Sequence, residues 1–277
     1  MSPVIVHTIA ELRAALAPLR GDGVAMVPTM GALHDGHLSL VRAAEGGVVV
    51  VSIFVNPTQF APHEDFDAYP RDLDSAVAKL AGTGRKVIVF APSARDMYPD
   101  GFSTTVTVGG PAMGLETDFR PHFFAGVATV VAKLLLAALP DSAVFGQKDY
   151  QQLLVVTRLA ADLGLATRIV GAPIAREEDG LAMSSRNAYL DARERKVAGQ
   201  LNRVLKDVTA RARETGDLRA AEAHGAAALK TAGFDSVDYV AIRDASTLAV
   251  ATTLERPARL LAAAKIGRTR LIDNMAV

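Results

Sequence analysis

The hydrophobic pattern of the first 174 residues alternates between two kinds of segment. Continuous apolar runs, typical of strands buried on both faces, occur at residues 24–30, 48–55, 87–90, 143–145 and 167–172. Segments with a helical pattern lie around them, at residues 8–19, 37–45, 72–81, 125–139 and 149–163. Buried strands separated by helices predict an α/β fold, a Rossmann-like parallel sheet with helices on both faces.

Two short segments carry further structural signals. Thr8 is followed three residues later by Glu11, which is the capping-box spacing, so Thr8 is expected to cap the helix at residues 8–19. Residues 104–108, TTVTV, alternate as an exposed or edge strand does, so a strand is expected there.

The pattern changes after about residue 174. Residues 191–232 are rich in Ala, Arg, Glu and Lys and predict two helices broken near Gly216 and Asp217. Residues 237–244 and 258–274 predict strands, with a turn at Gly267. We therefore expect a Rossmann-like domain at residues 1–174 and a smaller α+β C-terminal domain at residues 175–277.

Composition and charge exclude several functions. Of 277 residues, 50% are hydrophobic and 22% charged, which is enough for a packed core. The 30 basic and 30 acidic residues give a net charge of zero, which argues against a large nucleic-acid footprint. Without cysteine, disulfides, thiolate zinc sites and cysteine nucleophiles are excluded. The start of the chain lacks a signal-peptide pattern and no apolar run reaches the ~20 residues of a membrane helix, so a soluble, cytoplasmic protein is expected.

A strand-to-helix turn carries the first candidate chemistry. His34-Asp35-Gly36-His37 follows the strand at residues 24–30 and opens a helix expected from His37. Backbone N–H groups and the dipole at a helix N-terminus favour an anion, and side chains three residues apart lie on one side of the turn. Both imidazoles are therefore expected to reach one phosphate, with Gly36 leaving room for a nucleotide. Two close histidines also occur by chance, so other segments must support this interpretation.

Two further clusters suit phosphate and ribose. Lys148 and Asp149 lie at a strand-to-helix turn with Gln152 one helical turn on; a lysine can neutralise phosphate and an aspartate can bind ribose hydroxyls. A solvated, capped helix start explains these residues equally well. Residues 183–187, MSSRN, combine two hydroxyls with a guanidinium beside the expected domain junction, where a loop can close over a ligand. Alone, this segment could be a simple turn.

Two amides follow the strand at residues 48–55. Asn56 and Gln59 in IFVNPTQF suit the hydroxyl and carboxylate groups of a small polar substrate. Turn chemistry is the alternative, because Asn-Pro is a common turn signal.

Five motifs occur in the order and spacing of one known family. They are MVPTMGALHDGH, SIFVNPTQF, AYPRDL, FGQKDYQQ and DGLAMSSRNAYL. Together they resemble the pantothenate synthetase (pantoate–β-alanine ligase) family, from about residue 5 to the closing TRLIDNM. HDGH resembles the signature of the nucleotidyltransferase superfamily that includes class I aminoacyl-tRNA synthetases, and MSSR resembles its second phosphate-binding signature.

The resemblance implies an ATP-dependent, amide-forming ligase of pantothenate and coenzyme A biosynthesis. Such an enzyme makes pantothenate from (R)-pantoate and β-alanine through a pantoyl adenylate and releases AMP and pyrophosphate. It uses Mg²⁺, usually as a homodimer, and the C-terminal domain is expected to close over the ATP site. ATP, pantoate and β-alanine are the implied partners, with no nucleic acid and no membrane.

The resemblance also assigns residues to substrates. His34 and His37 would contact the ATP phosphates, with His37 as the family's proton donor, and Lys148 and Arg186 are the other expected catalytic residues. ATP would be bound by Met30, Gly31, Ala32, Leu33, His34, Asp35, Gly36, His37, Gly146, Gln147, Lys148, Asp149, Ala175, Met183, Ser184, Ser185 and Arg186. Among these, Gly146 and Asp149 would hold the ribose, and Ala175 and Met183 would line the adenine pocket. Pantoate would be bound by Gln59, Gln152 and Met30, and β-alanine by Gln59 and Asn56.

Three positions depart from the family pattern. Phe123 stands where a histidine is typical, with His122 one place early, and Gln147 replaces a common glutamate. Ser75 and Ala76 occupy positions where an acid linked to Mg²⁺ is usual, so no metal ligand is assigned. The loop before residue 48 is also shorter than usual.

Three alternatives differ in what they predict. Another small-molecule nucleotidyltransferase would retain AMP in its product, whereas a ligase releases it. A degenerate ATP-binding regulatory homologue, suggested by the departures, would bind ATP without turnover. An aminoacyl-tRNA synthetase is disfavoured by the zero net charge and by the lack of room for a tRNA-binding domain.

Overall fold

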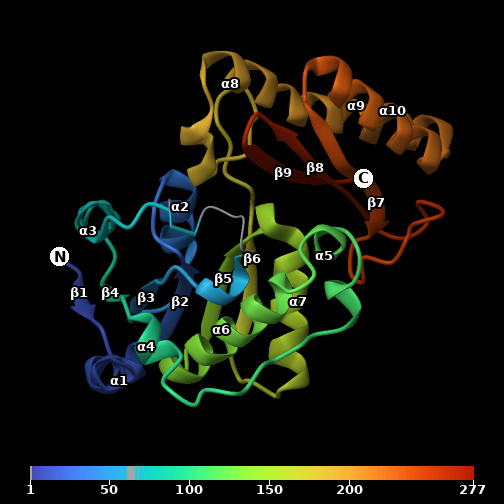
Figure 1. The fold of residues 1–277 in the computed structure, drawn as a ribbon. Coiled ribbons are helices and arrows are strands. Elements are labelled where there is room, and N and C mark those ends of the chain that lie inside the picture. Colours follow the sequence, from blue (N-terminus) through green and yellow to red (C-terminus); the bar gives the residue numbers. More distant parts are fainter. Residues whose placement is uncertain (1, 61–65, 68) are drawn as a thin grey trace. The chain divides into compact units, whose positions relative to one another are not determined.

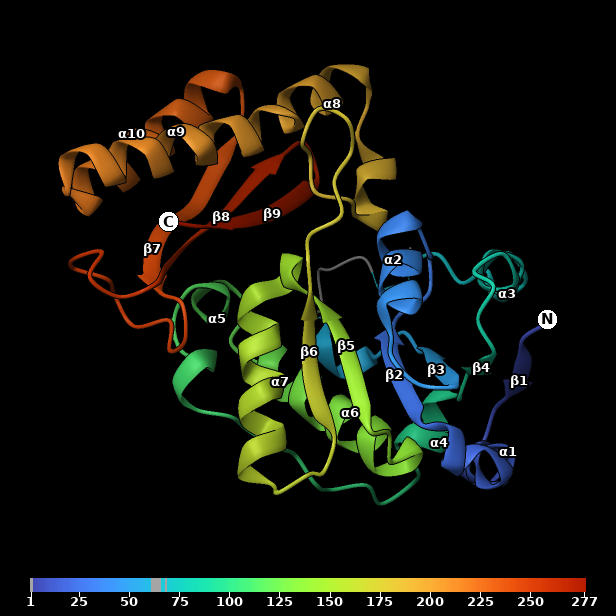
Figure 2. The ribbon, with the colours of Figure 1, turned by 180° about the vertical axis from the view of Figure 1, so that it is seen from behind.

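The computed structural model describes residues 2–60, 66–67 and 69–277. The chain divides into two compact units. Unit 1 comprises Met1–Gln147 and Val155–Pro173, and unit 2 comprises Lys148–Leu154 and Ile174–Val277. Figure 1 labels the helices and strands, and Figure 2 shows them from behind.

Unit 1 contains a six-stranded, parallel sheet with the strand order β1-β4-β3-β2-β5-β6. Its strands are β1 (Val4–Val6), β2 (Val24–Thr29), β3 (Val48–Ile53), β4 (Val87–Phe90), β5 (Ser142–Gly146) and β6 (Arg168–Ala172). This sheet, together with a separate antiparallel sheet in unit 2, confirms the predicted fold class. The short strand β1 was not predicted, because three residues at a sheet edge carry too little pattern.

Helices cover both faces of this sheet. Ala25, Val27, Val49 and Val51 pack in one cluster with apolar residues of α2 and α3. Successive residues of a strand point to opposite faces, so the intervening residues such as Met26 face the other way, where α6 contacts β2 and α1 contacts β4 and α6. The unit 1 helices are α1 (Ile9–Leu16), α2 (Asp35–Ala43), α3 (Leu73–Ala81), α4 (Ala94–Met97), α5 (Glu116–Phe119), α6 (Phe123–Ala138) and most of α7 (Tyr150–Asp162).

The first helix shows one local signal that was correct and one helix end that was not. The capping box at Thr8 is confirmed, since the Glu11 N–H donates to Thr8 Oγ1 at 3.1 Å and the Thr8 N–H donates to the Glu11 carboxylate at 3.1 Å. The expected end of this helix at residue 19 was wrong. Helix α1 ends at Leu16, and a 3₁₀ helix containing Pro18 follows, because proline cannot supply the next helical N–H.

The strand expected at residues 104–108 is absent. This segment has no ladder partner, and the Val106 N–H donates instead to Thr129 Oγ1 of α6 at 2.9 Å. The sheet edges are formed by β1 and β6. An alternation of polar and apolar residues shows that a segment is suited to be a strand. Whether it pairs depends on a neighbouring strand, which the local sequence does not reveal.

Unit 2 contains an antiparallel sheet with the order β7-β8-β9 and three helices. The elements are α8 (Ala192–Ala198), α9 (Gln200–Thr215), α10 (Leu218–Ala232), β7 (Ser236–Asp244), β8 (Ala258–Ile266) and β9 (Thr269–Ala276). The breaks expected at Gly216 and Gly267 are confirmed, and both glycines have positive φ angles, +69° and +52°. Two helices were expected where three occur, because Gly199 separates α8 from α9.

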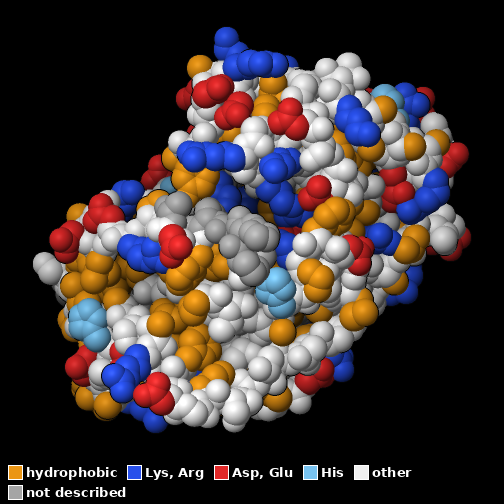
Figure 3. Space-filling view, viewed as in Figure 1, with side chains coloured by type: hydrophobic (Ala, Val, Ile, Leu, Met, Phe, Trp, Pro, Cys, Tyr) orange, Lys and Arg blue, Asp and Glu red, His pale blue; other side chains and the backbone are white. Residues whose placement is uncertain are grey.

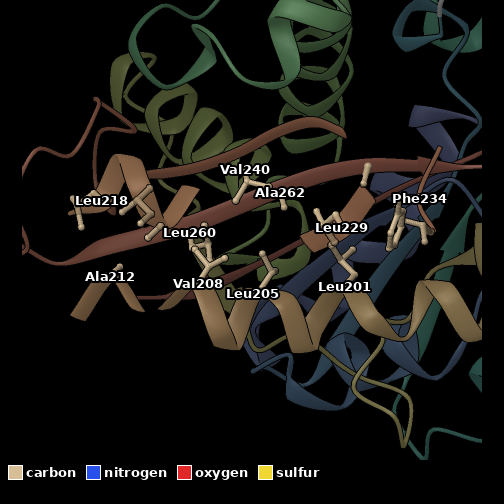
Figure 4. Close-up of a cluster of buried hydrophobic side chains, with 14 of the residues drawn as sticks. Leu201, Leu205, Val208, Ala212, Leu218, Leu229, Phe234, Val240, Leu260 and Ala262 are labelled. Carbon is tan, nitrogen blue, oxygen red and sulfur yellow. The ribbon is translucent and has the colours of Figure 1, made fainter. Parts of the chain in front are cut away.

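The core of unit 2 lies between this sheet and helices α9 and α10. Leu201, Leu205 and Val208 of α9 point toward strand residues such as Leu260 (Figure 4). The helices approach closely at Gly225, where an added Cβ would lie 2.5 Å from Val208 Cγ2. Within the described part of the chain, none of the helices combines the length and apolar character needed to cross a membrane.

Candidate active site

The sheet of unit 1 has a topological switch point between β2 and β5. The chain runs from β2 to β3 and β4 on one side, and then returns to β5 on the other side of β2. In open α/β sheets, ligands bind at the carboxyl ends of strands near such a point. The HDGH segment follows β2, Gly146 ends β5, and Asn56 follows the neighbouring strand β3.

His34 and His37 form a reciprocal cap at the start of α2. His34 is the N-cap residue, and its Nδ1 accepts the Gly36 N–H at 3.2 Å. His37 Nδ1 in turn accepts the His34 N–H at 3.4 Å, and the two ring centroids lie 4.1 Å apart. The expected helix start at His37 was wrong, because α2 begins at Asp35 with His34 as its cap. The expectation that both imidazoles lie together at the helix N-terminus is confirmed.

These two hydrogen bonds determine the tautomer of each ring. A nitrogen that accepts a backbone N–H carries no proton, so a neutral imidazole here is protonated on Nε2. Both rings lie at a helix N-terminus, where the dipole favours negative charge. A ring in this tautomer is a hydrogen-bond donor at Nε2 without taking up a further proton.

The loop before His34 is held in an uncommon backbone conformation. Gly31 and Ala32 both have positive φ, +89° and +48°, and the value is unusual for alanine. The Gly31 N–H donates to Thr29 Oγ1 at 3.2 Å, and Lys79 Nζ donates to the Leu33 carbonyl at 2.7 Å. The sequence did not indicate these anchors, because Lys79 reaches the loop from the far end of α3.

Asn56 is completely engaged with protein groups. It is 1% exposed, and its Nδ2 donates to Gln59 Oε1 at 3.1 Å and to the Gly126 carbonyl at 3.2 Å. Its Oδ1 accepts from the Thr58 N–H, the Thr58 hydroxyl and the Tyr98 hydroxyl, the last at 2.7 Å. Burial raises the pKa of Tyr98, which keeps it a neutral donor.

Gln59 lies beside Met30. Because Gln59 Oε1 accepts from Asn56, its Nε2 faces Met30, with 3.0 Å between Nε2 and Sδ. Helix α6 approaches this turn closely, since a Cβ on Gly126 would lie 2.4 Å from the Thr58 carbonyl oxygen. The sequence did not single out Gly126 or Tyr98. The one available signal was that Gly126 lies inside a helical pattern, which can indicate close packing.

The turn after β5 is divided between the two units. Gln147, in unit 1, donates from Nε2 to the Gly171 carbonyl at 3.4 Å. Lys148 and Asp149, in unit 2, form an ion pair of 3.7 Å, and 21% of the lysine side chain is exposed. Gln152 is half-buried on the first turn of α7.

The MSSR segment lies on a loop of unit 2. The Met183 N–H donates to the Ala175 carbonyl at 2.9 Å, so the two residues expected to line the adenine pocket are neighbours. Ser184 caps the 3₁₀ helix Ser185–Tyr189 by accepting the Arg186 N–H at 3.3 Å. The capped-turn interpretation and the phosphate interpretation are therefore compatible, because a capped helical start also presents backbone N–H groups.

The departures from the family pattern have structural roles. Phe123 lies under the guanidinium of Arg120, with 3.8 Å from Cζ to the ring centroid, whereas His122 is exposed. Ala76 is a buried core residue, and Asp72 accepts the Ser75 N–H as the cap of α3. Ala68 of the AYPRDL motif lies outside the described residues.

The described residues include no group of three or more His, Asp or Glu side chains that could hold a metal ion. Basic and acidic side chains both lie on the face drawn in Figure 3, as the zero net charge leads one to expect.

The fold is that of an α/β protein whose parallel sheet has a switch point, which is the place where sheets of this kind bind ligands. The family model described as pantoate-beta-alanine ligase matches residues 4–276. The chain belongs to the pantoate-beta-alanine ligase family.

Individual relatives agree with this assignment. A pantothenate synthetase from Nitrobacter hamburgensis is 57% identical, with 100% of this chain and 99% of the relative covered. The crystal structure of pantothenate synthetase from Thermus thermophilus has a TM-score of 0.92 at 47% identity and covers 98% of each chain. A Francisella tularensis pantoate-beta-alanine ligase, solved with beta-gamma ATP and beta-alanine, has a TM-score of 0.82 at 32% identity, covering 99% of this chain and 97% of that one. These relatives favour none of the alternative functions.

Proposed function

We propose that this protein condenses pantoate with β-alanine to form pantothenate in an ATP-dependent reaction. The observation that carries the proposal is the match of residues 4–276 to the pantoate-beta-alanine ligase family, together with the His34–His37 cap at the start of α2. Two imidazoles at a helix N-terminus suit the α-phosphate of ATP, where negative charge develops during adenylation. The chain is an ATP-dependent ligase.

The reaction we propose has two steps. A carboxylate oxygen of pantoate attacks the α-phosphorus of ATP, the bond to the β-phosphate oxygen breaks, and pyrophosphate leaves. The β-alanine amine then attacks the acyl carbon of the pantoyl adenylate, loses a proton, and expels AMP. His34 and His37 stabilise the phosphate charge by hydrogen bonding, and full proton transfer is not required because pyrophosphate is a good leaving group.

The residues that bind ATP are proposed from their chemistry and their match to the family. The loop from Met30 to Leu33 and the HDGH segment contact the nucleotide near its phosphates. Lys148 and Arg186 neutralise the triphosphate with Ser184 and Ser185 as hydroxyl donors. The other proposed contacts are Gly146 and Asp149 with the ribose, Gln147 beside them, and Ala175 and Met183 with adenine.

The side-chain amides of Gln59, Gln152 and Asn56 have different proposed roles in binding pantoate and β-alanine. We propose that Gln59 donates from Nε2 to pantoate, since its Oε1 is taken by Asn56, and that Gln152 and Met30 complete the pantoate contacts. Gln59 is also the proposed contact for β-alanine. Asn56 contributes indirectly: its donors and its oxygen are bound by protein groups, so it orients Gln59.

Mg²⁺ is proposed to arrive as the complex with ATP. Mg²⁺ keeps several waters and commonly binds through substrate phosphates with one or two carboxylates. Asp72, beside α3, caps that helix by accepting the Ser75 N–H. The phosphate oxygens are therefore the proposed ligands. A homodimer acting in the cytoplasm completes the proposal, on the family resemblance alone.

Pyrophosphate release tests the function. Purified protein is incubated with MgATP, alone and with pantoate, β-alanine or both, while pyrophosphate, AMP and pantothenate are measured. We expect release that depends on pantoate, and equal amounts of AMP and pantothenate when β-alanine is added. Folded protein that binds ATP but shows no pantoate-dependent release would contradict the proposal, and AMP retained in the product would indicate a different nucleotidyltransferase.

A further inference from the structure

Two consecutive residues of β9 hold two separate nucleotide-binding segments of unit 2. Asp273 and Asn274 are each 2% exposed, although both are polar. Asn274 contacts the segment that carries Lys148, and Asp273 contacts the loop that carries residues 183–186. All of these residues belong to the same compact unit.

Asn274 has one orientation that satisfies its neighbours. Its Oδ1 accepts Arg259 Nε–H at 2.8 Å, and its Nδ2 donates to the Lys148 carbonyl at 2.8 Å. A guanidinium only donates, so the Asn274 oxygen must face Arg259 and its NH₂ group must face Lys148. Arg259 also stacks on the ring of Tyr150, with 4.1 Å from Cζ to the centroid.

The same segment is anchored a second time. The Tyr150 hydroxyl donates to the Ala245 carbonyl at 2.8 Å, which lies at the end of β7. Residues 148–154 therefore belong to unit 2, although the helix they begin continues into unit 1. The contacts with Asn274, Arg259 and Ala245 give this assignment its physical basis.

Asp273 holds the base of the neighbouring loop. It accepts from both terminal nitrogens of Arg176, at 2.7 and 2.9 Å, and its side chain is 1% exposed. A bidentate pair of this kind fixes orientation as well as distance. Arg176 also donates to the Gly180 carbonyl at 2.9 Å and lies between Ala175 and the turn that leads to Met183.

We propose that Asp273 and Asn274 are positioning residues that hold Lys148 and the Ser184–Arg186 segment in one fixed arrangement within unit 2. Asn274 acts on Lys148 through its carbonyl, and Asp273 acts on the loop through Arg176. The proposal rests on the proposed function for the roles of Lys148 and Arg186. It extends that function to two residues that need not touch a substrate.

A double-mutant cycle tests the link between Asn274 and Lys148. Asn274→Asp keeps the shape and the Arg259 contact but places an acceptor against the Lys148 carbonyl. We expect it to lower kcat/KM for ATP in pantoate-dependent adenylation by about tenfold, while KM for pantoate changes less than about twofold. When combined with Lys148→Met, it should add less than about twofold, because groups that act as a unit are not additive. If the loss of kcat/KM in the double variant equals the product of the losses in the two single variants, the proposal is overturned.

Two further variants separate positioning from stability. Leu271→Ala on the same strand removes a buried side chain that has no polar atom to bond either segment, so it should lower the melting temperature but leave KM for ATP unchanged. An equal rise of KM for ATP in this variant would overturn a specific role for Asn274. Asp273→Asn should weaken ATP binding at least several-fold, and the loss should not add to that of Arg186→Met.

Binding of a non-hydrolysable ATP analogue distinguishes this proposal from the proposed function. If the wild type fails to make pantothenate, but Asn274→Asp and Lys148→Met weaken analogue binding non-additively, the positioning role stands and the ligase function fails. If the wild type is active and Asn274→Asp binds the analogue and reacts as the wild type does, the positioning role fails while the ligase function stands.

Discussion

The guanidinium of Arg120 lies over the ring of Phe123, with 3.8 Å between Cζ and the ring centroid. Arg120 also donates to Glu116 Oε1 at 3.1 Å and to the Gln59 carbonyl at 3.0 Å. The aromatic ring therefore supports a half-buried cation that fixes the backbone of a proposed substrate-binding residue. This gives a structural reason for phenylalanine at the place where the family typically has histidine.

Replacing Phe123 with leucine should destabilise the protein by about 1–2 kcal/mol. The change removes the cation–π contact of Arg120 and part of a half-buried ring, and partly desolvated cation–π pairs contribute roughly 0.5–2 kcal/mol. Urea unfolding measures the change in free energy. Phe119→Leu, at a side chain 48% exposed, is the matched control and should change stability by less than about 0.5 kcal/mol. Equal effects of the two substitutions would contradict this role for Phe123.

His34→Ala and His37→Ala should each slow adenylation by at least about tenfold, because loss of a preorganised charge-stabilising donor typically costs about 10²–10³ in rate. Single-turnover formation of pyrophosphate is the measurement. The alanine variants also lose part of the α2 cap, so circular dichroism and melting temperature serve as controls. A single-turnover rate equal to that of the wild type would remove these residues from the mechanism.

Asn56→Asp should raise KM for pantoate by about tenfold or more. An aspartate oxygen at the place of Nδ2 would face Gln59 Oε1 and the Gly126 carbonyl, which both accept hydrogen bonds. The Gln59 amide is then expected to turn over and present its oxygen, instead of its NH₂ group, to the substrate carboxylate. Steady-state kinetics with pantoate and ATP varied separately test this, and KM for ATP should change far less. A parallel rise in both constants would point to unfolding instead.

Gly126→Ala should be strongly destabilising, by about 2–4 kcal/mol, within the range of severe overpacking. The added Cβ would lie 2.4 Å from the Thr58 carbonyl oxygen and 2.9 Å from the Gln59 backbone nitrogen, so α6 or the 57–59 turn must shift. Denaturant unfolding measures the loss. Gly101→Ala is unsuitable as a control, because Gly101 has positive φ; Gly21→Ala, with open space around it, should be nearly neutral. A stable Gly126→Ala protein would show that the turn can move freely.

The Asp179–Arg195 pair should make stability depend on pH in acid. The hydrogen bond from Arg195 lowers the pKa of Asp179 below its ordinary value of 3.8. A carboxylate whose folded pKa is lowered stabilises the fold above its unfolded pKa, and this contribution is lost as pH falls through the folded pKa. Asp179→Asn should therefore lower the melting temperature at pH 7, and the difference from the wild type should shrink below about pH 4. A difference that stays constant to pH 2 would contradict this.

Much of the architecture follows from local sequence patterns. Residues 48–53 are apolar at every position but one, so the segment has no polar face and must be buried on both sides, which specifies a central parallel strand. The Thr8 cap depends on residues within one turn, so its signal is complete in the sequence. Gly216 and Gly267 likewise mark turns, and this signal is local because it depends on the positive φ angles that glycine adopts easily. The family motifs identify the histidine pair, the amides and the lysine as candidate site residues from the sequence alone.

The tertiary structure decided what each of these residues contacts. The TTVTV segment has strand-forming residues but no partner strand, and Thr129, distant in sequence, takes the Val106 N–H. Asn56 carries a polar side chain suited to a substrate, yet contacts from Gly126 and Tyr98 occupy it. Asn274 reaches Lys148 across 126 positions of sequence. The sequence by itself determined the secondary-structure elements and the chemical groups that they carry. A hydrogen bond between residues distant in sequence depends on how whole elements pack. Only the tertiary structure therefore decided which polar groups are bonded to other protein groups.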